Sequence, residues 1–198
     1  MLAATWAGPD RLEWDLSARA PVGPDRSTRG SIEPTLAELE DGSILMVMRG
    51  SNDVRPELPG HKWSARSRDG GRTWSEAVPW TYVDGVPFHS PSSCSQLLRH
   101  SGGGLYWLGN LTSTNPKGNR PRYPLVMGEV DEKTGLLHQA SVQAIDDRQP
   151  DDDPDLTLSN FMAHEDRETG EVLLHMSRPF ALRARDRQTA AYQYRIEP

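Results

Sequence analysis

The sequence predicts an all-β fold built from short strands, and three observations support this prediction. The 17 glycines and 16 prolines of the 198 residues separate short apolar segments along the chain, which is typical of strands joined by turns. No segment shows the sustained 3.6-residue periodicity of a long amphipathic helix. Turn-and-strand segments also recur along the chain, and an internal repeat of this kind narrows the choice among β folds.

The repeat consists of a glycine turn followed by an apolar strand that ends in a polar residue. It occurs at 41–49, 102–110 and 169–178. The marker glycines Gly42, Gly104 and Gly170 are 62 and 66 residues apart (104 − 42 and 170 − 104). A second turn type, at Asp69 and again at Asp131, keeps the interval of 62 residues (131 − 69). Two different turns with one period indicate a repeated supersecondary unit.

Each unit is expected to contain four antiparallel strands, which is typical of a β-propeller blade. An apolar strand precedes the first turn, at 35–39, 92–98 and 159–164, and a hairpin surrounds the second turn. A β-sandwich is the alternative, but sandwiches do not repeat two turn signatures at a fixed interval. We therefore expect one partial propeller domain over 1–198. Its blades are expected at about 31–85, 86–150 and 156–198, with 1–30, including a strand at 11–16, as the remnant of a preceding blade.

The segment Ser67-Arg-Asp-Gly-Gly-Arg-Thr-Trp74 resembles the Asp-box (BNR repeat) of the sialidase, or neuraminidase, superfamily, with the pattern Ser-x-Asp-x-Gly-x-Thr-Trp. This motif is structural: Asp69 is expected to accept hydrogen bonds from the turn backbone, and Trp74 to pack between neighbouring sheets. The resemblance covers Ile32 to Pro198 and implies a six-bladed sialidase-like propeller. At 62 residues per unit the chain supplies about three blades, so we expect it to be the C-terminal half of a longer protein or a truncated gene product.

A candidate site begins at Glu33, which precedes a strand, an Asp-Gly turn and a second strand that ends at Arg49. This order resembles a sialidase segment in which the glutamate assists a tyrosine nucleophile and the arginine is one of three that grip the substrate carboxylate. Adjacent antiparallel strands bring both residues to the inner end of one blade, where an arginine can hold a carboxylate bidentately. The alternative is an ordinary ion pair at the blade rim.

Two further residues extend this resemblance. Arg122, in the segment 119–126, resembles the family's third arginine, and Arg120 is the other candidate for this role. The alternative is that this segment is a basic loop tip. The family's nucleophilic tyrosine is absent from the corresponding segment, 158–161. Asn160 in that segment is a candidate to bind a sugar hydroxyl, and a hydrogen bond at a strand end is the alternative.

Other titratable residues offer alternatives for the chemistry. Tyr106 and Tyr123 are candidate replacements for the nucleophile. Glu165 or Asp166 is a candidate acid or base, although their segment is more typical of an exposed turn. The acidic run 151–155 lacks the glycine and distal glutamate of the familiar calcium loop, and the histidines lack the close pairing of a zinc site. No metal or other cofactor is therefore expected.

We expect a sialidase-like glycoside hydrolase that is exo-acting on a terminal acidic or other sugar. Glu33 is the expected base or activator, and Arg49 and Arg122 the expected carboxylate clamps. The absent tyrosine implies another nucleophile, water-mediated inversion or a substrate other than sialic acid. The alternative is a non-catalytic propeller that binds glycans or proteins, or an inactive fragment.

Charge and hydropathy exclude several other functions. The net charge of −6 comes from 28 acidic and 22 basic residues that are mixed along the chain, which argues against a nucleic-acid groove or binding to an anionic membrane. No apolar run is long enough to span a bilayer, and residues 1–10 lack the pattern of a signal peptide. Cys94, the one cysteine, cannot form an intrachain disulfide, and the sequence indicates no compartment.

Overall fold

The computed structural model describes residues 2–182 and 189–198. In this part of the chain the only helical element is the 3₁₀ turn η1 (Gln139–Ser141), and all other regular structure is β-strand. The prediction of an all-β fold is confirmed.

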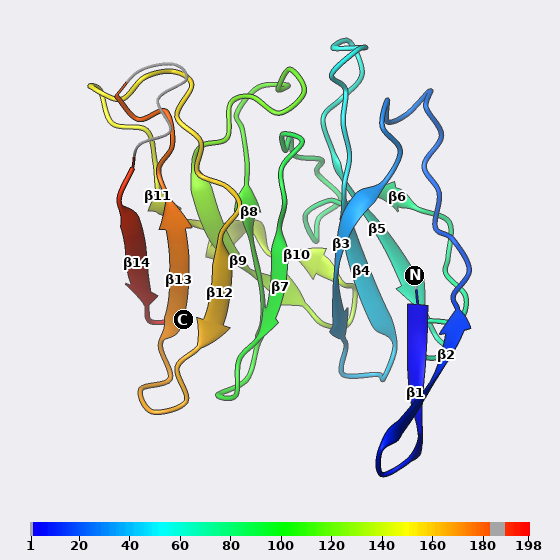
Figure 1. The fold of residues 1–198 in the computed structure, drawn as a ribbon. Coiled ribbons are helices and arrows are strands. Elements are labelled where there is room, and N and C mark those ends of the chain that lie inside the picture. The colour runs from blue at the N-terminus through cyan, green and yellow to red at the C-terminus, as the bar shows by residue number, and fades with distance from the viewer. Residues whose placement is uncertain (1, 183–188) are drawn as a thin grey trace.

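The strands form three antiparallel sheets and a separate hairpin, which stand side by side in Figure 1. The hairpin contains β1 (Leu2–Gly8) and β2 (Arg11–Leu16). The first sheet contains β3 (Ile32–Glu38), β4 (Ile44–Arg49), β5 (Lys62–Ser67) and β6 (Val78–Pro79). The second contains β7 (Gln96–Arg99), β8 (Leu105–Asn110), β9 (Leu125–Asp131), β10 (Leu136–Leu137) and β11 (Gln143–Asp146). The third contains β12 (Met162–Glu165), β13 (Val172–Ser177) and β14 (Ala191–Ile196).

The repeated turns occupy the same place in all three sheets. Gly42, Gly104 and Gly170 each precede the second strand of a sheet and have φ values of 76°, 86° and 75°. Only glycine adopts this left-handed backbone without a steric cost, so the turn requires it. The second turn type lies between β5 and β6 at Asp69, and it recurs between β9 and β10, where it begins at Asp131, the last residue of β9. The assignment of the sheets to propeller blades with the expected boundaries stays a prediction.

The number and bounds of the strands differ in part from expectation. The second sheet has a fifth strand, β11, which pairs with β9, and the third has three strands among the described residues. The strand expected at 92–98 runs over Gln96–Arg99 instead. Ser92 and Ser93 lie outside the sheet, and their backbone carbonyls accept hydrogen bonds from the side chains of Arg122 and Lys62.

Two apolar layers hold the three sheets together. Between the first and second sheets, Trp80 is fully buried and makes edge contacts with Phe88 and Trp107. Its indole Nε1 donates a hydrogen bond to the Gly135 carbonyl over 2.7 Å, which satisfies the polar end of a buried tryptophan. A second cluster that includes Leu108 joins the second sheet to the third. The order of the sheets is therefore fixed by packing between neighbours.

The turn at Ser67–Trp74 is closed by its own side chains, as expected. The Asp69 carboxylate accepts a hydrogen bond from the Thr73 N–H over 2.9 Å, and Ser67 Oγ donates to it over 2.8 Å. The Trp74 indole Nε1 donates to Ser17 Oγ over 2.9 Å. Trp74 was expected to pack between neighbouring sheets. Its indole instead ties this turn to the segment that follows β2.

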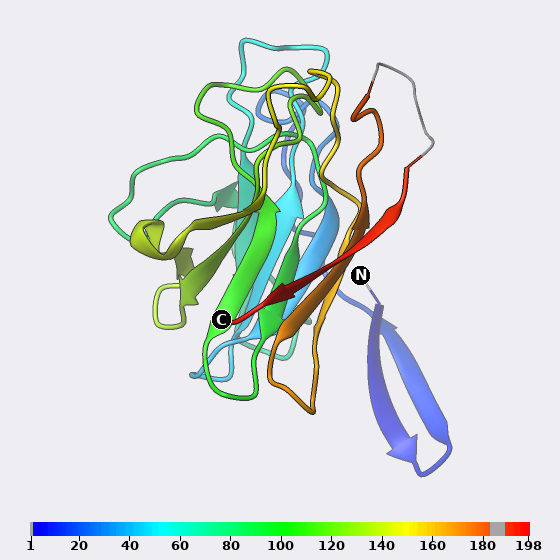
Figure 2. The ribbon, with the colours of Figure 1, turned by 90° about the vertical axis from the view of Figure 1, so that its left-hand side faces the viewer.

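The β1–β2 hairpin projects from the body of the molecule, as Figure 2 shows. The strand expected at 11–16 as an outer blade strand is here paired with β1 alone. Trp6 pairs with Leu12 and Ala4 with Trp14, so these side chains share one face of the hairpin. The two tryptophans are 68% and 63% exposed, which leaves this apolar face uncovered in the described chain.

Candidate functional site

The candidate site is formed where strand ends and loops meet at the end of the sheets that is uppermost in Figure 1. Because β3, β4 and β5 are antiparallel neighbours, the start of β3, the end of β4 and the start of β5 lie at this end. The loops 90–95 and 119–124 and the segment 157–160 reach it from the second and third sheets. Short-range strand pairing and long-range loop contacts thus supply residues to one place.

Glu33 and Arg49 are in direct contact. Ile32 pairs with Arg49 in the ladder, and an irregularity between Ile32 and Thr35 leaves Glu33 with a φ of 48°. Arg49 Nη1 lies 2.7 Å and 2.8 Å from the two carboxylate oxygens of Glu33. The Arg49 side chain is 11% exposed and that of Glu33 is 47% exposed. The guanidinium is therefore held in the protein while the carboxylate remains open to a ligand.

Arg122 reaches the same place from the second sheet. Arg49 Nε donates to Ser92 Oγ over 2.8 Å, and Arg122 Nη2 donates to the Ser92 carbonyl over 3.0 Å. Arg122 Nε is buried and has no hydrogen-bond partner in the described chain. Burial, and then the charge of Arg49, lower the pKa of Arg122. Its rival, Arg120, forms an ion pair with Asp155 instead.

Asn160 borders the site but does not contact Glu33 or Arg49. Its φ is 59°, and its backbone N–H donates to Cys94 Sγ over 3.2 Å. With Arg120 and Arg122 it lines a shallow hollow beside Pro179. Its exposed side chain is thus placed next to Arg122, and its role in binding stays a prediction.

Lys62 was missed by the sequence reasoning, since lysine is among the residues least expected inside a protein. It is fully buried, with 0% of its surface exposed, and it lies directly opposite Arg49 in the β4–β5 ladder. Its ammonium Nζ donates a hydrogen bond to the Ser93 carbonyl. Burial lowers the pKa of Lys62 to about 7, from an ordinary value of 10.5. Its position opposite Arg49 is known only from the pairing of β4 with β5.

Asn110 was not expected at the site either, although it is the polar residue that ends the strand of the second repeat. It is fully buried, and its Nδ2 lies within 3.2 Å, 3.1 Å and 2.9 Å of the carbonyls of Arg122, Pro124 and Leu158. One amide therefore fastens the loop that carries Arg122 to the segment that carries Asn160. We assign Asn110 a positioning role.

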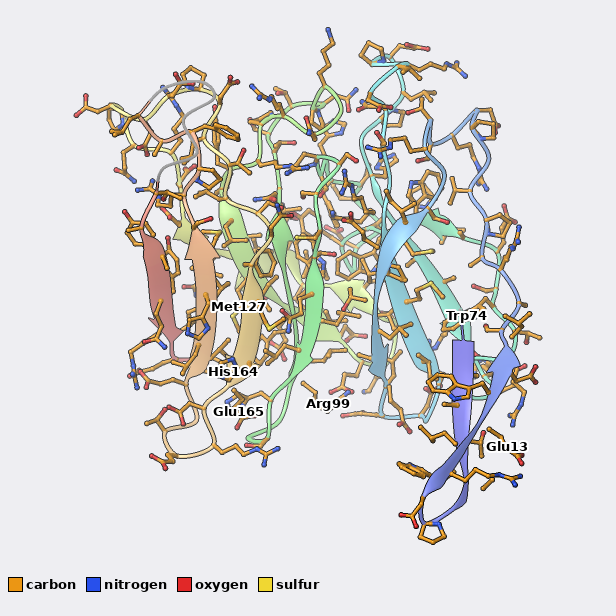
Figure 3. All side chains as sticks on the ribbon, viewed as in Figure 1. Glu13, Trp74, Arg99, Met127, His164 and Glu165 are labelled. Carbon is orange, nitrogen blue, oxygen red and sulfur yellow. The ribbon has the colours of Figure 1, made fainter. Side chains whose placement is uncertain are left out.

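The other candidate residues lie elsewhere. Tyr106 is at the opposite end of β8 from Asn110, and Tyr123 packs against the apolar layer between the second and third sheets. Glu165 accepts a hydrogen bond from the Ser101 N–H over 2.7 Å and lies at the lower end of the sheets in Figure 3. Neither tyrosine nor Glu165 contacts Glu33 or Arg49.

The acidic run 151–155 is used in ion pairs. Asp155 pairs with Arg120, and Asp152 lies 2.8 Å from Arg178 Nη2. Among residues 2–182 and 189–198, no group of three or more metal-ligating side chains is present. No helix in this same part of the chain is both long and apolar enough to span a membrane.

A larger hollow, of about 550 Å³, lies between β9, β11 and β14. Met127, Ile145 and Tyr194 line it, and Met127 is marked in Figure 3. The Tyr194 hydroxyl is occupied by a hydrogen bond to Asp146. We favour the Arg49 group over this hollow as the site because chemistry, rather than volume, distinguishes it: Arg49, Arg122 and Lys62 all donate hydrogen bonds to Ser92 or Ser93.

Comparison with known proteins gives a likeness at the level of structure only. No family model matches the sequence, and no curated protein matches it. The NanB sialidase of Streptococcus pneumoniae superposes with a TM-score of 0.57 and 19% identity, over 96% of this chain and 26% of the other. The intramolecular trans-sialidase of Ruminococcus gnavus gives 0.54 and 15%, over 96% and 37%. The fold is sialidase-like.

A third solved structure extends the likeness beyond sialidases. A GH43_12 protein retrieved from a capybara gut metagenome gives a TM-score of 0.54 and 10% identity, over 85% of this chain and 28% of the other. At such identities the sialidase-like fold is shared without any shared activity being implied. The chain spans 26%, 37% and 28% of the length of these three structures.

Proposed function

We propose that this chain is part of a sialidase-like β-propeller glycoside hydrolase that acts on a terminal acidic sugar. Glu33 is the base or activator in this proposal, and Arg49 and Arg122 hold the sugar carboxylate. One observation carries it: Arg49 and Arg122 donate hydrogen bonds to the same residue, Ser92, from two different sheets. Two guanidinium groups bound to one residue repel each other, and Glu33 pairs with Arg49 but not with Arg122 among the described residues, so a second anion would offset the repulsion that remains.

The charge around Ser92 favours an anionic ligand. Glu33 is the one carboxylate among the described residues that pairs with Arg49, and Arg122 and Lys62 have no carboxylate partner there. Arg122 is largely buried, and burial and the charge of Arg49 both disfavour its charged form. A carboxylate ligand bound beside Arg49 and Arg122 would supply the missing negative charge.

Glu33 is placed to act on a bound sugar. Its carboxylate is half exposed, and its contact with Arg49 holds it at the edge of the cationic group. A carboxylate in this position can accept a proton from an attacking water or hydroxyl group. Since the segment 158–161 contains no tyrosine, we propose that water attacks the sugar directly, with inversion.

A second candidate is a propeller that binds an acidic glycan without cleaving it. An inverting glycosidase needs two carboxyl groups, one as acid and one as base. Among the described residues, only Glu33 supplies a carboxyl group in contact with Arg49. This observation favours the binding function if the whole protein brings no second carboxyl group to the site.

Hydrolysis and binding assays separate the two candidates. The full-length protein would be incubated with fluorogenic glycosides that include a sialoside, beside the variants Glu33→Gln and Arg49→Ala. Arg99→Ala is a matched control, because it removes an arginine that pairs with Glu132 at the other end of the sheets. Turnover lost in the first two variants and kept in the control supports the hydrolase. Acidic-sugar binding without turnover, lost in Arg49→Ala, supports the binder, and neither binding nor turnover contradicts both.

A further inference from the structure

We infer that Lys62 is a third cation of this site, and that it takes up a proton when an anionic group binds between Arg49 and Arg122. This inference rests on the proposed function, since it assumes that the ligand group is anionic. It adds a residue that acts through its charge, and it makes ligand affinity depend on pH.

Lys62 lies beside the two arginines of the site. Arg49 and Lys62 are directly opposite each other in the β4–β5 ladder, and opposite residues of an antiparallel pair project to the same face of a sheet. Arg49 and Arg122 are bound to Ser92, and Lys62 is bound to the next residue, Ser93. Three cationic side chains from β4, β5 and the 119–124 loop therefore converge on two consecutive residues.

The Lys62 ammonium has few hydrogen-bond acceptors around it and faces groups of both charges. Its ammonium can donate three hydrogen bonds, but only the Ser93 carbonyl accepts one in the described chain. The charged or titratable groups that face it are Glu33 from β3, Arg49 from β4, Cys94 from the loop before β7 and Arg122 from the loop before β9. Burial and the two arginines disfavour the ammonium, while Glu33 and Cys94 favour it.

The balance of these effects makes Lys62 responsive to a ligand. Burial lowers the pKa of Lys62 to about 7, so both its charged and neutral forms are populated near neutral pH. A negative charge bound at Arg49 and Arg122 would offset the repulsion from these arginines and favour the ammonium. By linkage, a ligand that raises the pKa of Lys62 binds more tightly as the pH falls through the range above 7.

A purely structural role would be better served by an apolar residue. Methionine fills a similar volume without a charge to desolvate, whereas a buried ammonium without an ion pair is costly. The Ser93 carbonyl could equally be satisfied by water or a neutral donor. The presence of a lysine at this position is therefore best explained by its charge.

Lysine-selective NMR can observe this proton directly. The chain contains three lysines, Lys62, Lys117 and Lys133, and the latter two are exposed, so they serve as internal controls. The side-chain Cε and Nζ signals would be titrated with pH in the free protein, in inorganic sulfate and in N-acetylneuraminic acid. Lys62→Met assigns the Lys62 signal by its loss.

We expect the titration midpoint of Lys62 to rise by about one pH unit or more with either anion, while Lys117 and Lys133 stay unchanged. The affinity for N-acetylneuraminic acid should fall roughly tenfold between pH 6.5 and 8.5 in the wild type and stay nearly constant in Lys62→Met. The wild-type titration alone decides the question if the variant does not fold.

The outcomes distinguish this inference from the proposed function. If an anion binds and the Lys62 midpoint does not move, the inference is overturned and the proposed function survives. If sulfate binds and moves the midpoint but the acidic sugar does not bind, the role of Lys62 is supported and the acidic-sugar function is contradicted. If neither anion binds, both are overturned.

Discussion

Arg49 and Lys62 face each other at the ends of two paired strands, so that a guanidinium and a fully buried ammonium lie side by side. Two like charges placed together inside a protein reduce its stability. Such an arrangement is expected where a site is built for a ligand rather than for the folded state alone. The relationship leads directly to a prediction about stability.

Lys62→Met should stabilise the protein. The pKa of Lys62 is about 7 in the folded chain and 10.5 ordinarily, so the unfolded state binds more protons between these pH values. The stability of the wild type therefore rises with pH across this window. At pH 7 the variant should gain on the order of 3 kcal/mol in the free energy of unfolding, and less at pH 10. Urea denaturation at both pH values measures this.

The matched control for Lys62→Met is Lys133→Met, because Lys133 is exposed. It should change the free energy of unfolding by less than about 0.5 kcal/mol. Equal stability of wild type and Lys62→Met at pH 7 would show that the ammonium carries no burial penalty.

Asn110→Ala should weaken both the fold and the site. Its amide group serves the carbonyls of Arg122, Pro124 and Leu158, of which that of Arg122 also accepts from the Leu158 N–H. A buried acceptor left without a donor costs about 1–3 kcal/mol. Since the loop that carries Arg122 would be released, affinity for an acidic ligand should fall as well. Thermal denaturation and calorimetric titration measure the two effects, with the exposed Asn119→Ala as control. Unchanged affinity would contradict the positioning role.

Asp69→Asn should make the stability less sensitive to acid. Hydrogen bonds from Thr73 and then Ser67 lower the pKa of Asp69 to about 2, below its ordinary 3.8. The stabilisation is present above the ordinary value and is lost as the pH falls through about 2. The melting temperature of the wild type should therefore fall more steeply between pH 4 and 2 than that of the variant. Asp10→Asn, in the β1–β2 turn, is expected to behave like the wild type.

Trp80→Phe should destabilise the contact between the first two sheets. The change removes the hydrogen bond from Nε1 to the Gly135 carbonyl and leaves a cavity beside Phe88 and Trp107. A loss of about 2–4 kcal/mol is expected in chemical denaturation. Trp6→Phe, on the exposed face of the hairpin, should change stability by about 0.5 kcal/mol at most. Similar losses for both variants would argue against Trp80 as the centre of this apolar layer.

The sequence allowed one part of the candidate site to be predicted and not the other. Glu33 and Arg49 were expected together because a single hairpin of known polarity separates them, and their contact follows from pairing of Ile32 with Arg49. Arg122 was expected near them only by resemblance. Its contact with Ser92 joins two loops 30 residues apart, and loops carry no periodicity from which such a contact could be inferred.

The sequence by itself determined the all-β class and the repeated turns. These features depend on local causes, such as the left-handed backbone of Gly42 or the side-chain bonds of Asp69 within its own turn. Only the tertiary structure decided that three cations meet at Ser92 and Ser93 and that Lys62 is fully buried. The reason is physical: burial and charge at a site are set by packing between sheets, which brings together residues that are distant in the chain.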